Sequence, residues 1–274
     1  MNIVWKIFLF GLKFSRKIRD DKVRAYAAES AFFTIMSFFP VLMLLLSLIQ
    51  FTPLDQEQVL YAIEEITPFE LMYILEPVVG SIYNGSFALV SWTAIAALWA
   101  AGKGIIGVSD GLNSIYRIAE TKNYFVTRIR AACYTFVMIL ALIVSMGILV
   151  LGYGIQDFLK KTIPFIGEHP QTVMIWPMLS AMILLVLLFL VLYMFLPNRR
   201  MKAKTQLPGA IFSAVSWALF SYAFSIYLEY AVNMSVIYGG LTTLVVAMLW
   251  LYCCMYLLFV GAEVNHYIEH PELL

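Results

Sequence analysis

The sequence contains little charge, little cysteine and little histidine. Of its 274 residues only 13% are Asp, Glu, Lys or Arg, and only 3 are Cys and 3 are His. A soluble domain carries about twice that share of charged residues, whereas 62% hydrophobic residues indicate a chain whose surface faces hydrocarbon. Cys133, Cys253 and Cys254 lie inside apolar runs with no CxxC spacing, so we interpret them as packing residues.

Catalytic and nucleotide-binding motifs are also missing from the sequence. None of the histidines, His169, His266 and His270, lies in an HExxH motif or in a paired metal-ligand spacing. There is no Walker A sequence and no nucleophile elbow. We therefore expect a chain that is not an enzyme and that has no catalytic residues, no bound cofactor and no metal.

Apolar stretches long enough to cross a membrane occur six times. About 20 helical residues span a hydrocarbon core of roughly 30 Å, and the stretches lie near residues 30–51, 86–109, 131–155, 174–196, 207–230 and 238–263. They are continuously apolar instead of alternating, which favours helices over a β-barrel. The sequence predicts an all-α polytopic membrane protein with six transmembrane helices.

Lysine and arginine are distributed unevenly between the predicted loops. Seven precede the first span, four lie between spans two and three and four between spans four and five, whereas the other side has only Lys160 and Lys161. By the positive-inside rule, both termini are predicted to be cytoplasmic. The predicted organisation is a basic amphipathic segment on the cytoplasmic face at 1–28, a transmembrane domain at 29–265 and a short cytoplasmic tail at 266–274.

The first predicted outer loop, at 52–85, contains several acidic residues and no basic one. Residues 67–70 have the form of a capping box with proline at the first helical position. Because apolar residues then recur at helical spacing, we expect one or two short amphipathic helices on this face. The carboxylates are interpreted as a solvated face; a divalent-cation site is the alternative, without an EF-hand spacing to support it.

Polar side chains interrupt the apolar spans near their predicted cytoplasmic ends. An isolated charge at such depth costs a few kcal/mol, so pairing is expected, and we predict that Lys103 pairs with Glu263 or Glu29 of another span. In the alternative, Lys103 extends to the headgroups and the carboxylates cap helix ends or face water. The predicted functional polar layer consists of Glu29, Lys103, Asp110, Asn113, Glu263 and Asn265.

Three further patterns concern helix shape and lipid contacts. Pro40 removes a helix hydrogen bond in mid-span and predicts a kink. Glycines at positions 102, 104, 107 and 111 allow a neighbouring helix to approach closely. Anionic headgroups on the cytoplasmic side are the expected partners of the N-terminal segment and of the basic residues in "NRRMKAK", which are Arg199, Arg200, Lys202 and Lys204.

Four stretches carry a resemblance to a known family. "AAESAFFTIMSFFP", "ALWAAGKGIIGVSDGLNSIY", "LPNRRMKAKTQLPGA" and "YGGLTTLVVAMLWLYCCMYLLFVGAEVN" together resemble the YihY/virulence factor BrkB family over nearly the whole chain. The resemblance implies a six-span bacterial inner-membrane protein, some of whose relatives bear on envelope integrity and serum resistance. In span two the family commonly shows arginine or a small polar residue; Lys103 keeps a positive charge there without arginine's bidentate geometry.

The family has also carried a ribonuclease BN label. A metal-dependent nuclease needs a cluster of His and Asp ligands, which this sequence lacks, so we expect no nucleic-acid partner. Two classes of function remain: a transporter or flippase for an amphiphilic envelope component or hydrophobic compound, and a non-transporting membrane scaffold for an envelope or signalling partner. Intramembrane charge favours the first. The sequence leaves the protein partner and a homo-oligomer open.

Overall fold

The computed structural model describes residues 3–49, 55–66, 87–119, 125–137, 170–231 and 240–271, with single positions between 72 and 83 and at 123. Every regular element in these residues is helical, which confirms the all-α class for the described part of the chain. The capping box at 67–70, part of the remaining outer loop and residues 138–155 of the predicted third span lie outside the described residues.

The helices have the bounds α1 Ile3–Asp20, α2 Val23–Ile49, α3 Gln56–Ile66, α5 Phe87–Ile115, α8 Pro170–Phe195, α9 Ala203–Ala231 and α11 Gly240–Glu269, and residues 125–137 are helical as well. Helices α2, α5, α8, α9 and α11 overlap predicted apolar stretches, whereas α1 and α3 lie outside them. In the described residues, Ala203–Leu228 of α9 and Leu244–Glu269 of α11 are long and apolar enough to cross a membrane. The six-span arrangement and its orientation stay predictions.

Two predicted local features can be placed on these helices. In the outer loop, α3 forms before the helix that the capping box predicts, over a segment with apolar residues at helical spacing. In the first span, α2 runs through Pro40 as one helix, and the kink stays a prediction. α2 also begins at Val23, earlier than the predicted start of the span at residue 30.

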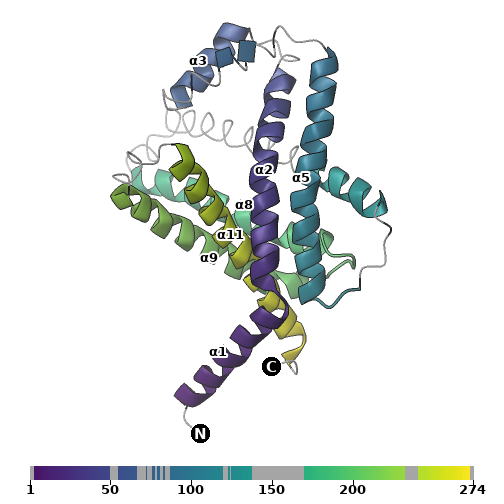
Figure 1. Ribbon diagram of the computed structural model, residues 1–274. Helices are drawn as coiled ribbons and strands as arrows, with labels where there is room; N and C mark the ends of the chain where they lie inside the picture. The colour runs from purple at the N-terminus through teal and green to yellow at the C-terminus, as the bar shows by residue number, and fades with distance from the viewer. Residues whose placement is uncertain are drawn as a thin grey trace.

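A two-residue turn, Asp21 and Lys22, separates α1 from α2. Lys22 has a φ of 54°, in the left-handed region that non-glycine residues rarely adopt, and the Asp21 N–H donates to the Lys17 carbonyl at 2.9 Å as α1 ends. The turn sends α1 away from the axis of α2, and the N-terminal end of α1 and the C-terminal end of α11 lie at the same end of the molecule (Figure 1).

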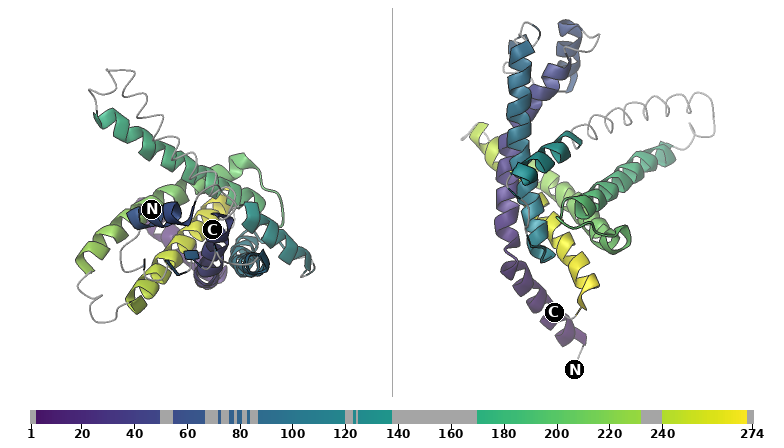
Figure 2. Two further views of the ribbon diagram at one scale, coloured as in Figure 1. Left: turned by 90° about the horizontal axis from the view of Figure 1, so that it is seen from above. Right: turned by 90° about the vertical axis from the view of Figure 1, so that its right-hand side faces the viewer.

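Small residues bring α2 and α5 together along much of their length. The two helices lie side by side in both views (Figures 1 and 2). A Cβ atom on Gly104 would lie 3.1 Å from Thr34 Oγ1, and one on Gly107 would lie 3.0 Å from Ser30 Oγ. These distances confirm the predicted close approach of a neighbouring helix at the glycines of the second span.

The core of the bundle is centred on α11, which packs against α2, α5 and α9, while α8 packs against α9. Leu112, Tyr193 and Phe259 are fully buried there. The outer faces of the helices, by contrast, expose large apolar side chains, as expected for surfaces in contact with lipid rather than water; these include Phe38, Trp92, Ile95, Leu187, Leu219 and Tyr222.

Candidate functional site

A buried ion triad lies where α1 meets the C-terminal part of α11. The Lys17 ammonium donates to Glu263 Oε2 at 2.6 Å and to Asp21 Oδ2 at 2.9 Å. The Lys17 side chain is 7% exposed and that of Glu263 0%. The triad therefore sets two carboxylates against one ammonium group inside the protein.

The apolar face of α1 explains why Lys17 is buried. Phe14 and Ile18 pack against the core, and Lys17 follows Phe14 by three residues, so it projects from the same side of the helix. Burying this face carries the ammonium group into the protein, where a charge without a partner would cost several kcal/mol. Glu263 and Asp21 supply the compensating charge, but Glu263 Oε1 has no hydrogen-bond partner in the described part of the chain.

Neutral amide and phenol groups extend the site toward α9 and the end of α5. Asn265 Oδ1 accepts a hydrogen bond from the Gly209 N–H at 2.6 Å, and Asn265 Nδ2 donates to Gln206 Oε1 at 3.0 Å. The Tyr116 hydroxyl donates to the same oxygen at 2.6 Å. Burial raises the pKa of Tyr116 well above its ordinary value, so this hydroxyl keeps its proton and remains a donor.

The helices around this network cross closely. A Cβ atom on Gly209 would overlap the Gly261 carbonyl oxygen, and one on Gly261 would overlap Ser213 Oγ. Tyr193 of α8 joins the same crossing, because its hydroxyl donates to the Leu258 carbonyl at 2.6 Å and lies 2.7 Å from Ser213 Oγ. Hydrogen bonds thus connect α8, α9 and α11 just beside the ion triad.

Two histidines, His266 and His270, follow Glu263 in the sequence. His266 is 4% exposed, and its Nε2 atom has no hydrogen-bond partner among the described residues. Its ring centroid lies 6.0 Å from that of Tyr116 and 5.2 Å from that of His270. His270 is exposed, so the row leads from a buried carboxylate to the surface.

The predicted pairing of Lys103 is wrong. The structure pairs Glu263 with Lys17, while Lys103 is exposed and places its Nζ atom 5.2 Å from the centroid of the Phe33 ring. Glu29 is exposed as well. The reason is geometric: α5 turns Lys103 outward beside α2, and α1 brings a closer ammonium group to α11. The alternative, in which Lys103 extends to the headgroups, stays a prediction.

The other members of the predicted polar layer lie at different depths. Asn113 and Asn265 are buried and Asp110 is half-buried. Asn113 Oδ1 accepts a hydrogen bond from the Asn198 N–H at 2.8 Å, which fixes the loop after α8. Sequence reasoning did not select three buried members of the site: Lys17, Tyr116 and Gln206. Of these, Lys17 carried a usable signal, because it shares a helix face with Phe14.

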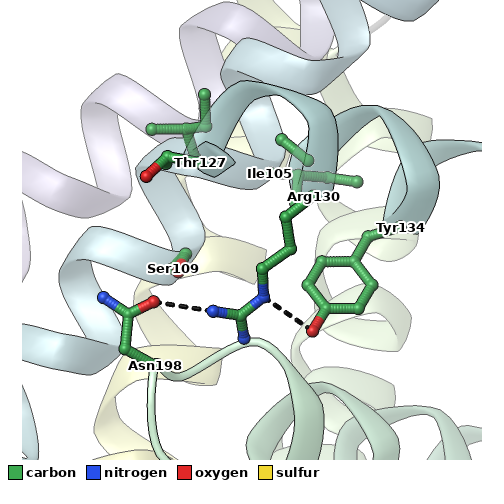
Figure 3. A pocket seen from close by; sticks show the side chains of 8 residues that line it. Ile105, Ser109, Thr127, Arg130, Tyr134 and Asn198 are labelled. Atoms are coloured by element: carbon green, nitrogen blue, oxygen red, sulfur yellow. Dashed lines mark hydrogen bonds between the residues drawn. The ribbon is translucent and has the colours of Figure 1, made fainter. Parts of the chain in front are cut away.

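A second polar cluster surrounds Arg130, at a small pocket between α5, residues 125–137 and the end of α8 (Figure 3). The guanidinium donates to Asn198 Oδ1 at 2.7 Å, to Tyr134 Oη at 2.8 Å, and to the carbonyls of Phe195, Leu196 and Pro197. These carbonyls belong to the end of α8, where a positive charge is favourable. The pocket leaves about 10 Å³, the lower limit for one water molecule, so Arg130 is a capping group.

The basic residues expected to contact headgroups follow this cluster directly. All four are exposed in the loop and the first turn of α9; they are Arg199, Arg200, Lys202 and Lys204. Within the described part of the chain, no three His, Cys, Asp or Glu side chains lie close enough to hold a metal ion. The expectation of a chain without metal or cofactor stays a prediction.

Comparison with known proteins gives a consistent picture. The sequence pattern of the family described as virulence factor BrkB matches residues 14–273. The chain is 28% identical over 252 residues to the ribonuclease-like protein YfkH of Bacillus subtilis (strain 168), covering 90% of each chain. It is 22% identical over 273 residues to a UPF0761 membrane protein of Pseudoalteromonas atlantica, covering 96% of this chain and 87% of that protein. A UPF0761 membrane protein of Aliivibrio salmonicida is 23% identical over 273 residues, covering 97% and 84%. No solved structure matches the chain.

Proposed function

The chain belongs to the virulence factor BrkB family of membrane proteins, and from this premise we propose that it is a multi-pass transporter or flippase of the bacterial cytoplasmic membrane. Its substrate would be an amphiphilic envelope component or a hydrophobic compound. The orientation is that of the positive-inside rule, with both termini in the cytoplasm. In this orientation the ion triad lies at the cytoplasmic end of the bundle.

The observation that carries the proposal is the buried ion triad in a chain that otherwise exposes apolar surface. Lys17 and Glu263 are withdrawn from solvent, although replacing a buried ion pair by well-packed apolar residues is often neutral or stabilising. Stability alone therefore does not call for these charges. Ionisable groups inside membrane bundles usually mark a substrate or ion pathway, which favours a transporter over a passive scaffold.

We also propose that the chain is not an enzyme, although one relative has a ribonuclease-like name. A metal-dependent nuclease positions its metal with several His and Asp ligands. The described His, Cys, Asp and Glu residues include no such group, and the buried carboxylate Glu263 is held by an ammonium group instead. This arrangement supports a role in binding or coupling.

The proposal is tested by reconstituting the full chain into liposomes that contain fluorescent phosphatidylglycerol or phosphatidylethanolamine. Chemical quenching of the outer leaflet measures how fast these lipids change leaflet. We expect the protein to accelerate the exchange of at least one of them, and Glu263→Gln to slow it by at least about tenfold, because the substitution removes the ionisable group that the proposal places on the pathway.

Asp20→Asn is the matched control, because Asp20 is an exposed acidic residue at the end of α1. This control is expected to keep the activity of the unmodified chain. Exchange no faster than in empty liposomes, for both lipids, would reject the flippase and favour the scaffold. An equal loss of lipid exchange in Asp20→Asn and Glu263→Gln would show that the activity does not depend on the ion triad.

A further inference from the structure

Three titratable side chains lie along the C-terminal end of α11: Glu263 and His266 on the helix, and His270 directly after its last residue, where the His270 N–H still donates to the His266 carbonyl at 2.9 Å. Their spacings of three and four residues bring them onto neighbouring turns of one helical side. Their exposure rises along the row, from 0% for Glu263 to 4% for His266 and an exposed His270. The two imidazole centroids are 5.2 Å apart.

The ion triad has more negative than positive groups. Two carboxylates, of Asp21 and Glu263, face a single ammonium group, of Lys17. One negative charge is therefore not compensated within the triad, in which Glu263 is fully buried. Buried net charge is costly, and a proton is the smallest group that removes it.

Two unsatisfied atoms indicate where such a proton would bind and travel. In the described part of the chain, neither Glu263 Oε1 nor His266 Nε2 has a hydrogen-bond partner, although both atoms are buried. Such atoms are rare in folded proteins and call for an explanation. A carboxylate oxygen and an imidazole nitrogen are also the groups that proton relays use.

Charged and polar side chains from the helices packed against α11 surround Glu263, His266 and His270. α1 contributes Lys17 and Asp21, and Arg117 follows the end of α5. Burial disfavours a positive charge on His266 most, the nearby Lys17, His270 and Arg117 add to this effect, and Asp21 opposes it, so a proton on this imidazole is held weakly. The remaining neighbours are Tyr26 of α2, whose ring packs on Phe259, Tyr116 beside His266, Gln206 of α9, Tyr193 of α8 and Glu269 of α11 itself.

We propose that Glu263 is a proton-binding site and that His266 and His270 carry the proton between it and the surface at the end of α11. A proton passes from water to a ring nitrogen of His270, then to His266 and finally to Glu263 Oε1. Each imidazole accepts one proton at one nitrogen and releases one from the other, so only N–H and O–H bonds form and break. The use of this proton as a coupling ion rests on the proposed transport function; its binding does not.

The protonation of Glu263 is tested on the full chain in membranes by infrared spectroscopy during a pH titration. A protonated carboxyl group gives a carbonyl band separate from that of a carboxylate. We expect such a band to appear as the pH is lowered over about pH 8 to 5, to be absent in Glu263→Gln and to persist in Asp20→Asn. Should Glu263→Gln protein not be recovered, Glu263→Asp serves, because the band then moves in frequency. A band unchanged in either Glu263 variant would overturn the site.

The relay is tested by the rate at which the band forms after a rapid pH jump. His266→Gln and His270→Gln are expected to slow its formation by at least about tenfold without removing it at equilibrium. Unchanged rates in both would overturn the relay while leaving the site.

Lipid exchange under an imposed pH gradient separates the two proposals. A titrating Glu263 in a chain without exchange activity would reject only the flippase. Exchange activity without a Glu263 band would reject only the proton site.

Discussion

Replacing Lys17 by methionine tests how strongly the ion triad holds α1 to α11. Lys17 is 7% exposed and Glu263 0%, so the stability losses known for buried ion pairs apply. Removing the ammonium group of the triad is expected to cost about 3–5 kcal/mol of unfolding free energy. Glu263→Gln should cost less, about 1–3 kcal/mol, because Asp21 still accepts from Lys17 at 2.9 Å. The double variant should lose less than the sum, by at least about 1 kcal/mol.

The assay is equilibrium unfolding of purified protein in mixed micelles, followed by tryptophan fluorescence and circular dichroism. Arg16→Met is the matched control, because Arg16 is the preceding basic residue of α1 and is exposed; its loss should stay within about 0.5 kcal/mol. Equal losses in Lys17→Met and Arg16→Met would refute the reasoning. Strictly additive losses of Lys17→Met and Glu263→Gln would do the same, since two groups in contact must be coupled.

The remaining predictions concern the helix crossing, the Arg130 cap, the basic loop and the topology. Gly209→Ala and Gly261→Ala should each cost about 1–3 kcal/mol of unfolding free energy, because their Cβ atoms would overlap the neighbouring helix. Gly11→Ala is the control, since a Cβ atom there meets nothing within 4 Å, and it should leave the unfolding transition unchanged. Equal unfolding transitions in all three variants would contradict the close helix crossing. Arg130→Lys should cost about 1–3 kcal/mol of unfolding free energy through the lost carbonyl contacts. Arg128, whose guanidinium lies over the Trp99 ring and donates to the Trp99 carbonyl, is the control, and Arg128→Lys should cost less than about 1 kcal/mol. The reverse order in the same assay would disprove the capping role. Replacing Arg199, Arg200, Lys202 and Lys204 by glutamine should weaken retention of phosphatidylglycerol relative to phosphatidylcholine, by about 1 kcal/mol per residue, as measured by lipid co-purification; an unchanged ratio would exclude headgroup contact there. Reporter fusions at positions 65 and 165 should be external and those at 122, 202 and 270 internal, and an external fusion at 270 would overturn the six-span topology.

Hydropathy predicted the helices well because burial in lipid leaves little choice of backbone structure. Continuous apolar runs cover α2, α5, α8, α9 and α11, and a chain without water must satisfy its own hydrogen bonds. The close contact at Gly104 and Gly107 was also predictable, since only small residues allow backbones so near. Glu263 and Asn265 were selected from their position at the end of an apolar run, and both are buried, whereas Glu29, selected by the same argument, is exposed.

The partner of Glu263 was not predictable in the same way. Its choice depends on the direction of α1 relative to α2, which is set at the turn of Asp21 and Lys22; Lys22 has a positive φ, and the turn contains no glycine or proline that would have predicted it. The rotation of α5 about its axis, which turns Lys103 toward Phe33, is set by packing along the whole helix. Both depend on tertiary packing, so the depth of a residue in its predicted span selected Lys103 instead of Lys17 as the partner of Glu263.

The contact between Lys17 and Glu263 joins residues that are 246 positions apart, and this separation orders the biogenesis of the protein. During synthesis α1 leaves the ribosome long before α11, so in the proposed multi-pass topology the ammonium group of Lys17 would be at the membrane surface without Glu263 while the intervening helices insert. The Lys17 ammonium gains its Glu263 partner only when α11 is in place. A chain interrupted before α11 would leave the Lys17 ammonium with Asp21 as its remaining partner in the triad.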